Sequence, residues 1–369
     1  MTTAQPEPAL DRPVDEEVLL RVRGLTKSYG GQRSGVRMRR SNQVHALRDV
    51  SFDVHRGETL GLVGESGSGK STAASCVLRL AEPDAGSVEL DGTDVLGLPN
   101  RELRRIRSRM QMVFQDPYGS LDPRFSVREL VEEPLLVHGE HDAGVRRTRA
   151  LEMLERVGLS AALAERNAHA FSGGQRQRIA IARALVLNPE LVVLDEPVTA
   201  LDVSVQAQVL NLLTDLQAEL RLTYLFIVHD LAVAQYVCHR IAVMYLGEIV
   251  ELADSDELFA NPLHPYTVSL LIAAPVPDPD VMVQTRTALR ETKVQPGVAA
   301  SPGCPLRPRC PVGADRPECL TAPTLREIAP GHSVACHYPG ELQQRLSLQP
   351  GPPGPELNPS AERTARDYN

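Results

Sequence analysis

The stretch Gly64-Glu65-Ser66-Gly67-Ser68-Gly69-Lys70-Ser71 decides how this sequence is interpreted, because it fills every position of the P-loop pattern GxxxxGK[ST]. A short apolar segment, Thr59 to Val63, precedes it, and a helix is expected to begin near Lys70. Glycines let several backbone N–H groups and the helix N-terminus converge on phosphate oxygens. The stretch therefore predicts a phosphate site in which Lys70 reaches the outer phosphates and the Ser71 hydroxyl binds Mg²⁺.

A second signal is the apolar segment Leu191-Val192-Val193-Leu194-Asp195-Glu196, which ends in two carboxylates. A buried strand of this kind delivers charge to the edge of a parallel sheet, where ligands bind in α/β folds. Taken alone, adjacent acidic residues after a strand more often cap a helix or lie in a surface turn. Beside a P-loop, we expect Asp195 to hold Mg²⁺ through its water shell and Glu196 to polarise an attacking water.

The remaining periodicity predicts an α/β protein with a mainly parallel sheet. Apolar and polar residues alternate from Leu19 to about Val54, which indicates antiparallel strands. Buried strands at Leu191 to Leu194 and Thr223 to Val228 flank a helix at Val203 to Leu220. After roughly Pro275 proline recurs and helical periodicity fades, so we expect a domain boundary there.

Four segments are predicted along the chain: a disordered N-terminus at 1–17, a principal domain at 18–275, a cysteine-bearing extension at 276–340 and a Pro-rich disordered tail at 341–369. The principal domain is expected to contain a helical subdomain at about 101–187. Within it, the Arg-bearing segment 30–42 is interpreted as a solvated loop without an assigned role.

Length and charge restrict the possible functions. The 369 residues exceed the usual size of one domain, which favours a principal domain with an appendage. The net charge of -8 argues against a nucleic-acid partner. No apolar run approaches the roughly 18 to 20 residues of a spanning helix, and Met1 to Glu17 lack the features of a secretory signal. We therefore expect the chain to stay in the cytosol and not to cross a membrane by itself.

A more specific motif is Phe171-Ser172-Gly173-Gly174-Gln175, which resembles the signature of ABC ATPases, usually written LSGGQ. The resemblance implies an ABC nucleotide-binding domain: a RecA-like core, an antiparallel β subdomain and a helical subdomain. In this family ATP is sandwiched between the P-loop of one subunit and the signature of another. Because the sequence holds one such set, the resemblance implies a second ATPase chain as partner.

Other family positions occur in the expected order. Tyr29 resembles the aromatic residue that stacks on adenine, and Gln115 resembles the Q-loop glutamine that touches Mg²⁺ near the contact with the membrane domain. Ala200-Leu201-Asp202 resembles the D-loop, and His229 resembles the switch histidine at the γ-phosphate. The full set implied at ATP is Tyr29, Gly64, Glu65, Ser66, Gly67, Ser68, Gly69, Lys70, Ser71, Thr72, Gln115, Ser172, Gly173, Gly174, Gln175 and Asp202.

Within the ABC family, the chain resembles the ATPases of oligopeptide and dipeptide importers from roughly Leu19 to Tyr338. The resemblance rests on Gly61 to Thr72, Gln111 to Tyr118, Asn261-Pro262-Leu263-His264-Pro265-Tyr266-Thr267 and the cysteine-bearing extension. It implies import of peptides, or of nickel complexes or glutathione. It also implies a companion ATPase, two permease subunits and an extracytoplasmic binding protein, with this chain peripheral at the cytoplasmic face of the membrane.

Two segments bear on the type of subunit. Phe114-Gln115-Asp116-Pro117-Tyr118 and Pro275-Val276-Pro277-Asp278-Pro279 look more like the second, F-type, ATPase of such importers. Two rival functions fit less well. A soluble, non-transport ABC ATPase would carry tandem motif sets or a long insertion. A non-hydrolysing regulatory subunit would lack Glu196 or His229.

Four cysteines, Cys304, Cys310, Cys319 and Cys336, lie in one stretch near the C-terminus. Five, eight and sixteen residues separate them in turn, so no CxxC pair is present and a zinc ribbon fits poorly. Thiolates on open loops suit a [4Fe–4S] cluster, which is also what the family resemblance implies. Zinc and metal-free thiols stay open as alternatives. A cluster would staple a region too small for its own core, with redox sensing as a second use.

The predicted mechanism follows from these residues. Two ATPase subunits close on ATP, and a water oriented by Glu196 attacks the γ-phosphate in line. Lys70, Mg²⁺ and His229 stabilise the developing charge. The resemblance implies that closure drives the permease through a groove near Gln115.

Overall fold

The computed structural model describes residues 17–30, 44–199, 201–273 and 303–346. The predicted N-terminal segment up to residue 16, residues 31–43 of the Arg-bearing loop, Ala200 of the D-loop, the Pro275 to Pro279 segment and residues 347–369 of the tail lie outside these ranges.

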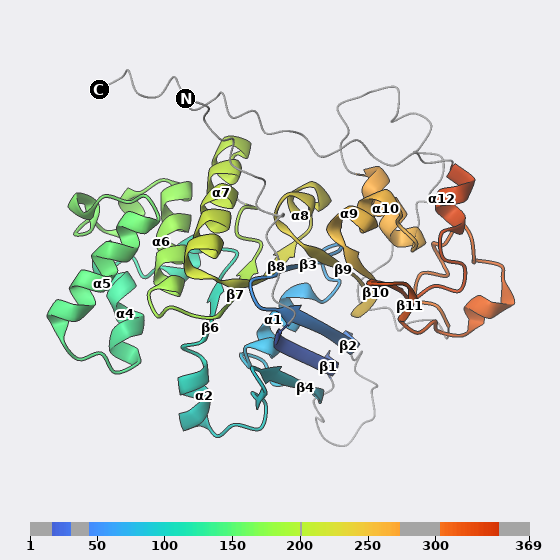
Figure 1. Cartoon of the computed structure of the whole chain (residues 1–369), viewed down its shortest axis with the longest axis horizontal. Coiled ribbons are helices and arrows are strands. Elements are labelled where there is room, and N and C mark those ends of the chain that lie inside the picture. Colours follow the sequence, from blue (N-terminus) through green and yellow to red (C-terminus); the bar gives the residue numbers. More distant parts are fainter. Residues whose placement is uncertain (1–16, 31–43, 200, 274–302, 347–369) are drawn as a thin grey trace.

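Two sheets form the framework (Figure 1). The smaller sheet is antiparallel, with the strand order β2-β1-β4-β5. Its strands are β1 (Val18–Tyr29), β2 (Val44–His55), β4 (Ala85–Leu90) and β5 (Thr93–Asp94). The alternation that the sequence predicted from Leu19 to Val54 is present, because residues of β1 and β2 point alternately into and out of the core.

The larger sheet has eight strands in the order β11-β12-β10-β9-β3-β8-β7-β6. Strands β3, β6, β7, β8 and β9 run parallel, and β10, β12 and β11 add antiparallel pairs at one edge. Their bounds are β3 (Thr59–Val63), β6 (Met110–Val113), β7 (Leu191–Asp195), β8 (Thr223–Val228), β9 (Arg240–Tyr245), β10 (Glu248–Asp254), β11 (Arg326–Ala329) and β12 (His332–Val334). Every residue of β3, β7 and β8 is buried, which explains their apolar sequences.

Helices cover both faces of the larger sheet. Helix α1 packs against strands of both sheets and so fills the space between them (Figure 1). The α-helices are α1 (Lys70–Val77), α2 (Asn100–Ile106), α3 (Pro117–Ser120), α4 (Val127–Val137), α5 (Ala143–Arg156), α6 (Gly173–Leu185), α7 (Val203–Leu220), α8 (Leu231–Val237), α9 (Ser255–Ala260), α10 (Pro265–Ala273) and α12 (Glu341–Leu346). Short 3₁₀ turns occur at Ala161–Leu163, Ala168–Ala170 and Pro317–Leu320. No helix among the described residues has both the length and the apolar character needed to cross a membrane.

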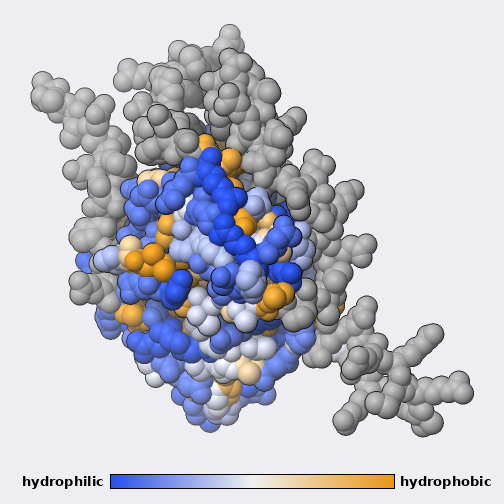
Figure 2. All heavy atoms as spheres, turned by 90° about the vertical axis from the view of Figure 1, so that its right-hand side faces the viewer, coloured by the Kyte–Doolittle hydropathy of each residue, from blue (hydrophilic) through white to orange (hydrophobic). Residues whose placement is uncertain are grey.

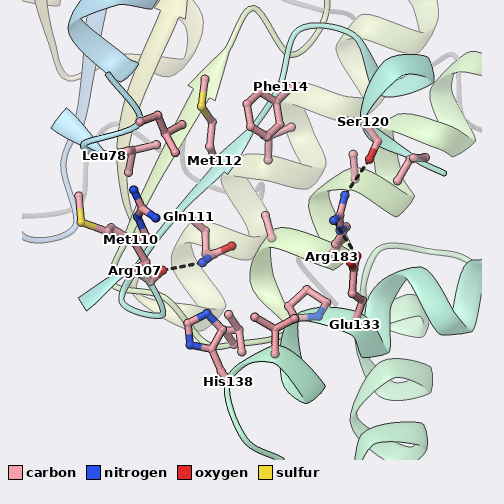
Figure 3. A pocket seen from close by; sticks show the side chains of 18 residues that line it. Leu78, Arg107, Met110, Gln111, Met112, Phe114, Ser120, Glu133, His138 and Arg183 are labelled. Carbon is pink, nitrogen blue, oxygen red and sulfur yellow. Dashed lines mark hydrogen bonds and ion pairs between the residues drawn. The ribbon is translucent and has the colours of Figure 1, made fainter. Parts of the chain in front are cut away.

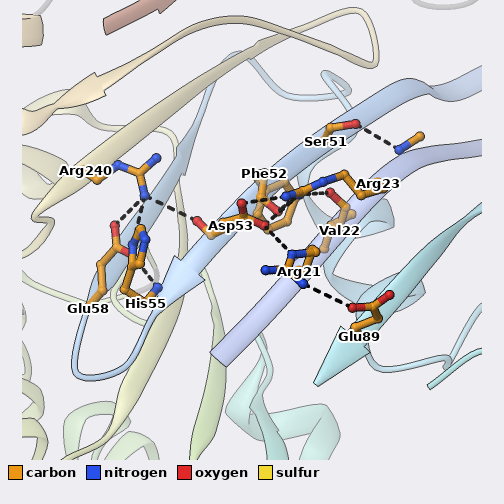
Figure 4. A network of polar contacts seen from close by, with 11 residues as sticks. Arg21, Val22, Arg23, Ser51, Phe52, Asp53, His55, Glu58, Glu89 and Arg240 are labelled. Atoms are coloured by element: carbon orange, nitrogen blue, oxygen red, sulfur yellow. Dashed lines mark hydrogen bonds and ion pairs between the residues drawn. The ribbon is translucent and has the colours of Figure 1, made fainter. Parts of the chain in front are cut away.

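A polar network joins the two sheets (Figure 4). Arg23 of β1 makes a two-pronged ion pair with Asp53 of β2, with both N–O distances at 2.6 Å. Arg240 of β9 donates to Glu58 at 3.1 Å, and His55 lies 2.9 Å from the same carboxylate. Only 1% of Glu58 is exposed, so this carboxylate depends on its charged partners, and Arg240 also donates to Asp53 O of β2 at 3.4 Å, which links the two sheets.

Two predicted boundaries differ from the structure. The helical subdomain expected at about 101–187 is interrupted by β6, which belongs to the larger sheet because Met110 and Val113 are buried beside β7. The disordered tail expected from 341 begins instead with helix α12. That helix is anchored by buried Leu342 and by the ion pair of Glu341 with Arg316 at 2.7 Å.

The C-terminal segment adds to the larger sheet. Strand β12 pairs with β10 through Glu251↔Val334 and Leu252↔Ser333. At this seam His332 Nε2 lies 2.8 Å from the Glu251 carboxylate, and both side chains are almost fully buried. The surface on this side of the molecule is mainly hydrophilic, with small separate apolar spots (Figure 2).

Candidate functional site

The predicted phosphate loop joins β3 to α1. Gly64 has φ 158° and Gly69 has φ 107°. A Cβ at Gly64 would collide with the carbonyl oxygen of Met244, and one at Gly69 with that of Ala46. Glycine is therefore required at both positions for the chain to turn before α1 begins at Lys70.

Lys70 lies beneath this loop with 4% of its surface exposed. Its Nζ donates to the carbonyl oxygens of Gly64 at 2.7 Å and Glu65 at 3.0 Å. Burial lowers the pKa of Lys70, and the carboxylates of Glu196 and Asp195 partly offset that shift. The ammonium group is thus held at the acidic edge of the larger sheet.

Ser71 and Asp195, predicted as Mg²⁺ ligands, are in direct contact. Ser71 Oγ donates to Asp195 Oδ1 at 3.0 Å. Burial raises the pKa of Asp195, the hydrogen bond from Ser71 opposes the rise, and neighbouring Glu196 adds to it. Hydroxyl and carboxylate oxygens are ligands of the kind that Mg²⁺ prefers, so this pair fits the predicted metal.

Glu196 is the point at which several predicted residues meet. Gln115 Nε2 donates to Glu196 Oε2 at 2.9 Å, and Thr199 Oγ1 donates to the same oxygen at 3.1 Å. The Nδ1 atom of His229 lies 3.6 Å from that oxygen. Glu196 itself has φ 46°, a left-handed conformation that is uncommon for this residue type. Residues from three different loops therefore converge on one carboxylate.

A cavity of about 740 Å³ opens in front of these groups. It is lined by Tyr29, Val44, His45, Ala46, Arg48, Gly64, Glu65, Ser66, Gly67, Gly69, Lys70, Ser71, Thr72, Gln115, Glu196, His229, Leu246 and Leu270. Tyr29 stands at its edge and is 46% exposed, so its ring is accessible to a flat ligand. The volume lies within the usual range for small-molecule sites.

The signature residues lie elsewhere. Ser172 caps α6: its hydroxyl accepts from Gln175 N at 3.4 Å, and the Gln175 side chain accepts from Ser172 N at 3.1 Å. Gly174 packs so closely on Val205 of α7 that a Cβ there would collide with it. Asp202 is exposed at the start of α7. None of the four signature residues Ser172 to Gln175 lines the cavity, so the described part of one chain does not assemble the complete predicted ATP site.

A second hollow, of about 350 Å³, lies between β6 of the larger sheet and helices α4 and α6, which together with α5 we call the helical layer (Figure 3). Apolar side chains including Met112 and Phe114 form one wall, and Phe114 is 45% exposed. On the opposite side Arg183 donates to Glu133 at 2.7 Å and to the Ser120 carbonyl oxygen at 2.7 Å. Phe114 lines this hollow, whereas the next residue, Gln115, lines the first cavity, so the predicted groove near Gln115 stays a prediction.

The four clustered cysteines are all buried, and none of them forms a disulfide. Gly313 N donates to Cys310 Sγ at 3.2 Å, and Tyr338 N donates to Cys336 Sγ at 3.4 Å. A Cβ at Gly313 would collide with Cys319 Sγ and would lie 3.7 Å from Cys310 Sγ. Among the described residues, however, no group of three or more His, Cys, Asp or Glu is placed to hold a metal ion. The prediction of an iron–sulfur cluster therefore has no support from this arrangement.

Sequence reasoning missed three contributors to the site. Thr199 contacts Glu196, Tyr266 accepts a hydrogen bond from Glu65 N at 2.9 Å, and Arg309 lies 3.4 Å from the Glu65 carboxylate. Tyr266 lies in a segment on which the family resemblance rests, but the neighbouring residues did not predict a contact with the P-loop. Nothing in the sequence brings Arg309 next to residue 65.

Two family models match the chain. The model described as "ABC transporter" covers residues 47–199, and the one described as "Oligopeptide/dipeptide transporter, C-terminal region" covers residues 250–319. A putative peptide import ATP-binding protein of Brucella ovis is 52% identical over 322 residues, which are 87% of this chain and 98% of the relative. The oligopeptide transport ATP-binding protein AppF of Bacillus subtilis is 47% identical over 330 residues, covering 88% and 98% of the two chains.

Solved structures agree with the fold. A dimeric ATP-binding cassette, MJ0796, bound to ADP and phosphate in a post-hydrolysis state, has a TM-score of 0.56 and 33% identity, covering 64% of this chain and 98% of that one. The protein cbiO1 of Clostridium perfringens, part of an ABC transporter complex, has a TM-score of 0.58 and 28% identity over 66% of this chain and 92% of its own. Together with the P-loop, the paired carboxylates and the signature, these matches show that the chain belongs to the ABC transporter family of ATP-binding proteins, in the group that carries the oligopeptide/dipeptide transporter C-terminal region.

Proposed function

We propose that this chain hydrolyses ATP to power the import of peptides across the cytoplasmic membrane. The observation that carries the proposal is the convergence of Gln115, Thr199 and His229 on the Glu196 carboxylate, beside Lys70 and the Ser71–Asp195 pair. The peptide substrate is inferred from the names of the relatives, since the residues that select a transported molecule belong to other chains.

The proposed roles follow from position. Tyr29 stacks on the base, and the P-loop from Gly64 to Thr72 surrounds the phosphates with backbone N–H groups. Ser71, Gln115 and Asp195 would hold Mg²⁺, which would supply positive charge to neutralise the phosphates. Glu196 orients and polarises the attacking water.

Lys70 and His229 complete the catalytic set. Both stabilise charge on the transferred phosphoryl group. The Glu196 carboxylate accepts hydrogen bonds from Gln115 and Thr199, so these contacts hold it in place to accept a hydrogen bond from the water.

A second ATPase chain completes the site in this proposal. The signature of each chain, in which Ser172 is exposed, covers the nucleotide of the other together with Asp202. This requirement is testable with the purified chain, because a site shared between two chains makes the specific ATPase activity depend on protein concentration or on added companion subunit. A specific activity that stays high and constant over a hundredfold dilution would contradict the shared site.

We further propose that the hollow between the larger sheet and the helical layer receives a cytoplasmic segment of a permease subunit. Its apolar wall at Met112 and Phe114 and the rim formed by Arg183 and Glu133 suit an amphipathic helix. The chain would then be peripheral at the cytoplasmic face of the membrane. Phe114→Asp should release the chain from membranes that contain the permeases without changing nucleotide affinity, as measured by co-sedimentation.

Transport of peptides is tested in cells that lack this chain. Uptake of a labelled dipeptide and a labelled oligopeptide should return with the wild-type chain and not with Lys70→Ala. Uptake of nickel complexes or glutathione, with no uptake of peptide, would replace peptide by one of these alternative substrates. The relatives' names do not bear out the F-type assignment, which stays a prediction.

The [4Fe–4S] cluster also stays a proposal. It rests on the sequence pattern of four cysteines and on the family resemblance, since the described residues place no group of three or more ligands around one metal ion. Cys304, Cys310, Cys319 and Cys336 would be the ligands. Anaerobic purification should give roughly four irons and four sulfides per chain, and both should be lost in Cys304→Ser. A chain that contains zinc alone, or no metal, would contradict the cluster.

A further inference from the structure

Two side chains from the C-terminal third of the sequence reach the first variable position of the P-loop. Tyr266, in α10, is 2% exposed, and its ring packs on Tyr245 at 4.6 Å between ring centroids. Arg309 lies in the segment that carries the clustered cysteines. Both contact Glu65, which is 201 residues before Tyr266 and 244 residues before Arg309 in the sequence.

Glu65 is held through all three of its polar groups. Its backbone N–H donates to Tyr266 Oη at 2.9 Å, and its carbonyl oxygen accepts from Lys70 Nζ at 3.0 Å. Its carboxylate faces the guanidinium group of Arg309 at 3.4 to 3.5 Å. Two of these three contacts, those of Tyr266 and Arg309, therefore tie the start of the P-loop to the C-terminal region.

The fold of the cysteine-bearing segment sets the position of Arg309. Arg309 N donates to Leu306 O at 2.8 Å, and Cys304 N donates to Cys319 O at 3.1 Å. The first bond closes a tight turn directly before Cys310, and the second ties Cys304 to the backbone at Cys319. A change that breaks the turn at Arg309 would therefore move the guanidinium group relative to Glu65.

Charge gives this contact a consequence for nucleotide binding. The Glu65 side chain is half exposed and lines the cavity in which we place the phosphates. A free carboxylate there would repel ATP, because both carry negative charge. The Arg309 side chain, 27% exposed, supplies the compensating positive charge from outside the cavity.

We propose that Arg309 is a positioning residue for nucleotide binding, which neutralises and holds Glu65 and so couples the cysteine-bearing segment to the P-loop. The inference depends on the proposed assignment of the P-loop cavity to ATP. Arg309 acts through Glu65, since the guanidinium group contacts that carboxylate. By linkage, nucleotide binding stabilises the cysteine-bearing segment to the same extent that the segment favours nucleotide.

The experiment measures the Kd of a fluorescent ATP analogue for the full chain with Mg²⁺ present. Arg309→Met should raise the Kd about three- to fivefold, in line with the loss of one partly exposed ion pair. The same substitution in a chain that already carries Glu65→Gln should alter the Kd by less than about twofold, because no carboxylate is left to neutralise. The effect should shrink as salt is added.

Two controls separate this role from a general effect on folding. Arg307→Met removes a guanidinium group of the same segment, whose Nε donates to Ala314 O at 3.1 Å, and it should lower Tm without raising the Kd. Lys70→Ala should abolish binding; if it does not, the assignment of the cavity fails. An Arg309→Met chain that binds nucleotide as tightly as wild type, or an equal loss of affinity on the Glu65→Gln background, would overturn the proposal.

Discussion

At the residue scale, the site depends on a few side chains whose conformations are fixed by neighbours. Glu196 is the clearest case, because it follows the buried strand β7 and adopts a positive φ of 46°. Its N–H donates to Ile227 O at 3.0 Å, and this bond to β8 holds the conformation. Backbone strain of this kind persists only where the surroundings impose it. The carboxylate is therefore presented at a fixed point beside Gln115.

Replacing Glu196 by Gln tests its role. The amide cannot polarise the water as a carboxylate does, so we expect the ATPase rate to fall at least about 100-fold while nucleotide Kd changes little. Phosphate release and analogue binding measure the two quantities. Glu219→Gln, which removes an exposed carboxylate paired with Arg156 at 3.3 Å, is the control and should retain full activity. Retained activity in Glu196→Gln would move the role of base to another residue.

At the element scale, two helices begin with the same local structure and serve different purposes. Helix α4 starts with a capping box between Ser126 and Glu129, and α6 starts with one between Ser172 and Gln175. Ser126 lies in the helical layer and is 8% exposed. Ser172 is exposed and belongs to the signature. Both helix starts have the same capping pattern, whereas only the second has an exposed cap residue, which in the proposed function faces a partner's nucleotide.

This pair of caps allows a matched comparison. Ser126→Ala and Ser172→Ala should each lower the free energy of unfolding by roughly 0.5 to 2 kcal/mol, the usual cost of losing such a cap. Only Ser172→Ala should also reduce ATPase activity when the partner subunit is present. Chemical denaturation and ATPase assays on the same preparations check both effects. Equal activity losses in the two variants would show that the activity follows stability rather than the signature.

At the scale of the whole molecule, the C-terminal segment is part of the core rather than a separate appendage. The β10–β12 pairing extends the larger sheet, and Glu251 accepts hydrogen bonds from Leu263 N at 2.6 Å and His264 N at 3.0 Å as well as contacting His332. One buried carboxylate thus joins the sheet, the start of α10 and the C-terminal strands. Stability and pH should be linked at this seam.

His264 determines in which direction the stability changes with pH. Burial lowers the pKa of His264 to about 4, although the nearby Glu251 carboxylate acts in the opposite direction. The unfolded chain, with the ordinary histidine pKa near 6.5, binds a proton that the folded chain excludes. Stability from this residue is therefore present above about pH 6.5 and is lost as the pH falls towards 4, by on the order of 1 to 3 kcal/mol.

Denaturant unfolding between pH 7 and pH 4 measures this loss. His264→Gln should flatten the part of the profile that lies below pH 6.5. His141→Gln, at an exposed histidine, is the control and should leave the profile unchanged. An unchanged slope in His264→Gln would place the acid sensitivity elsewhere.

The sequence by itself determined the elements that a local pattern specifies. Strands β3 and β8 and helix α7 have the predicted bounds, because continuous apolar runs and turn residues are local signals. The P-loop and the carboxylates after β7 were predicted for the same reason. The insertion of β6 into the helical stretch was not, since a four-residue strand carries too weak a period to be recognised alone.

Only the tertiary structure decided which distant residues meet. The partners of Glu65, the convergence on Glu196 and the joining of β12 to β10 each bring together residues far apart along the chain. Such contacts depend on how the sheets and helices pack, and no periodicity or motif records that packing. The sequence therefore specified the chemistry of the nucleotide loop, and the packing of the C-terminal segment specified what holds that loop in place.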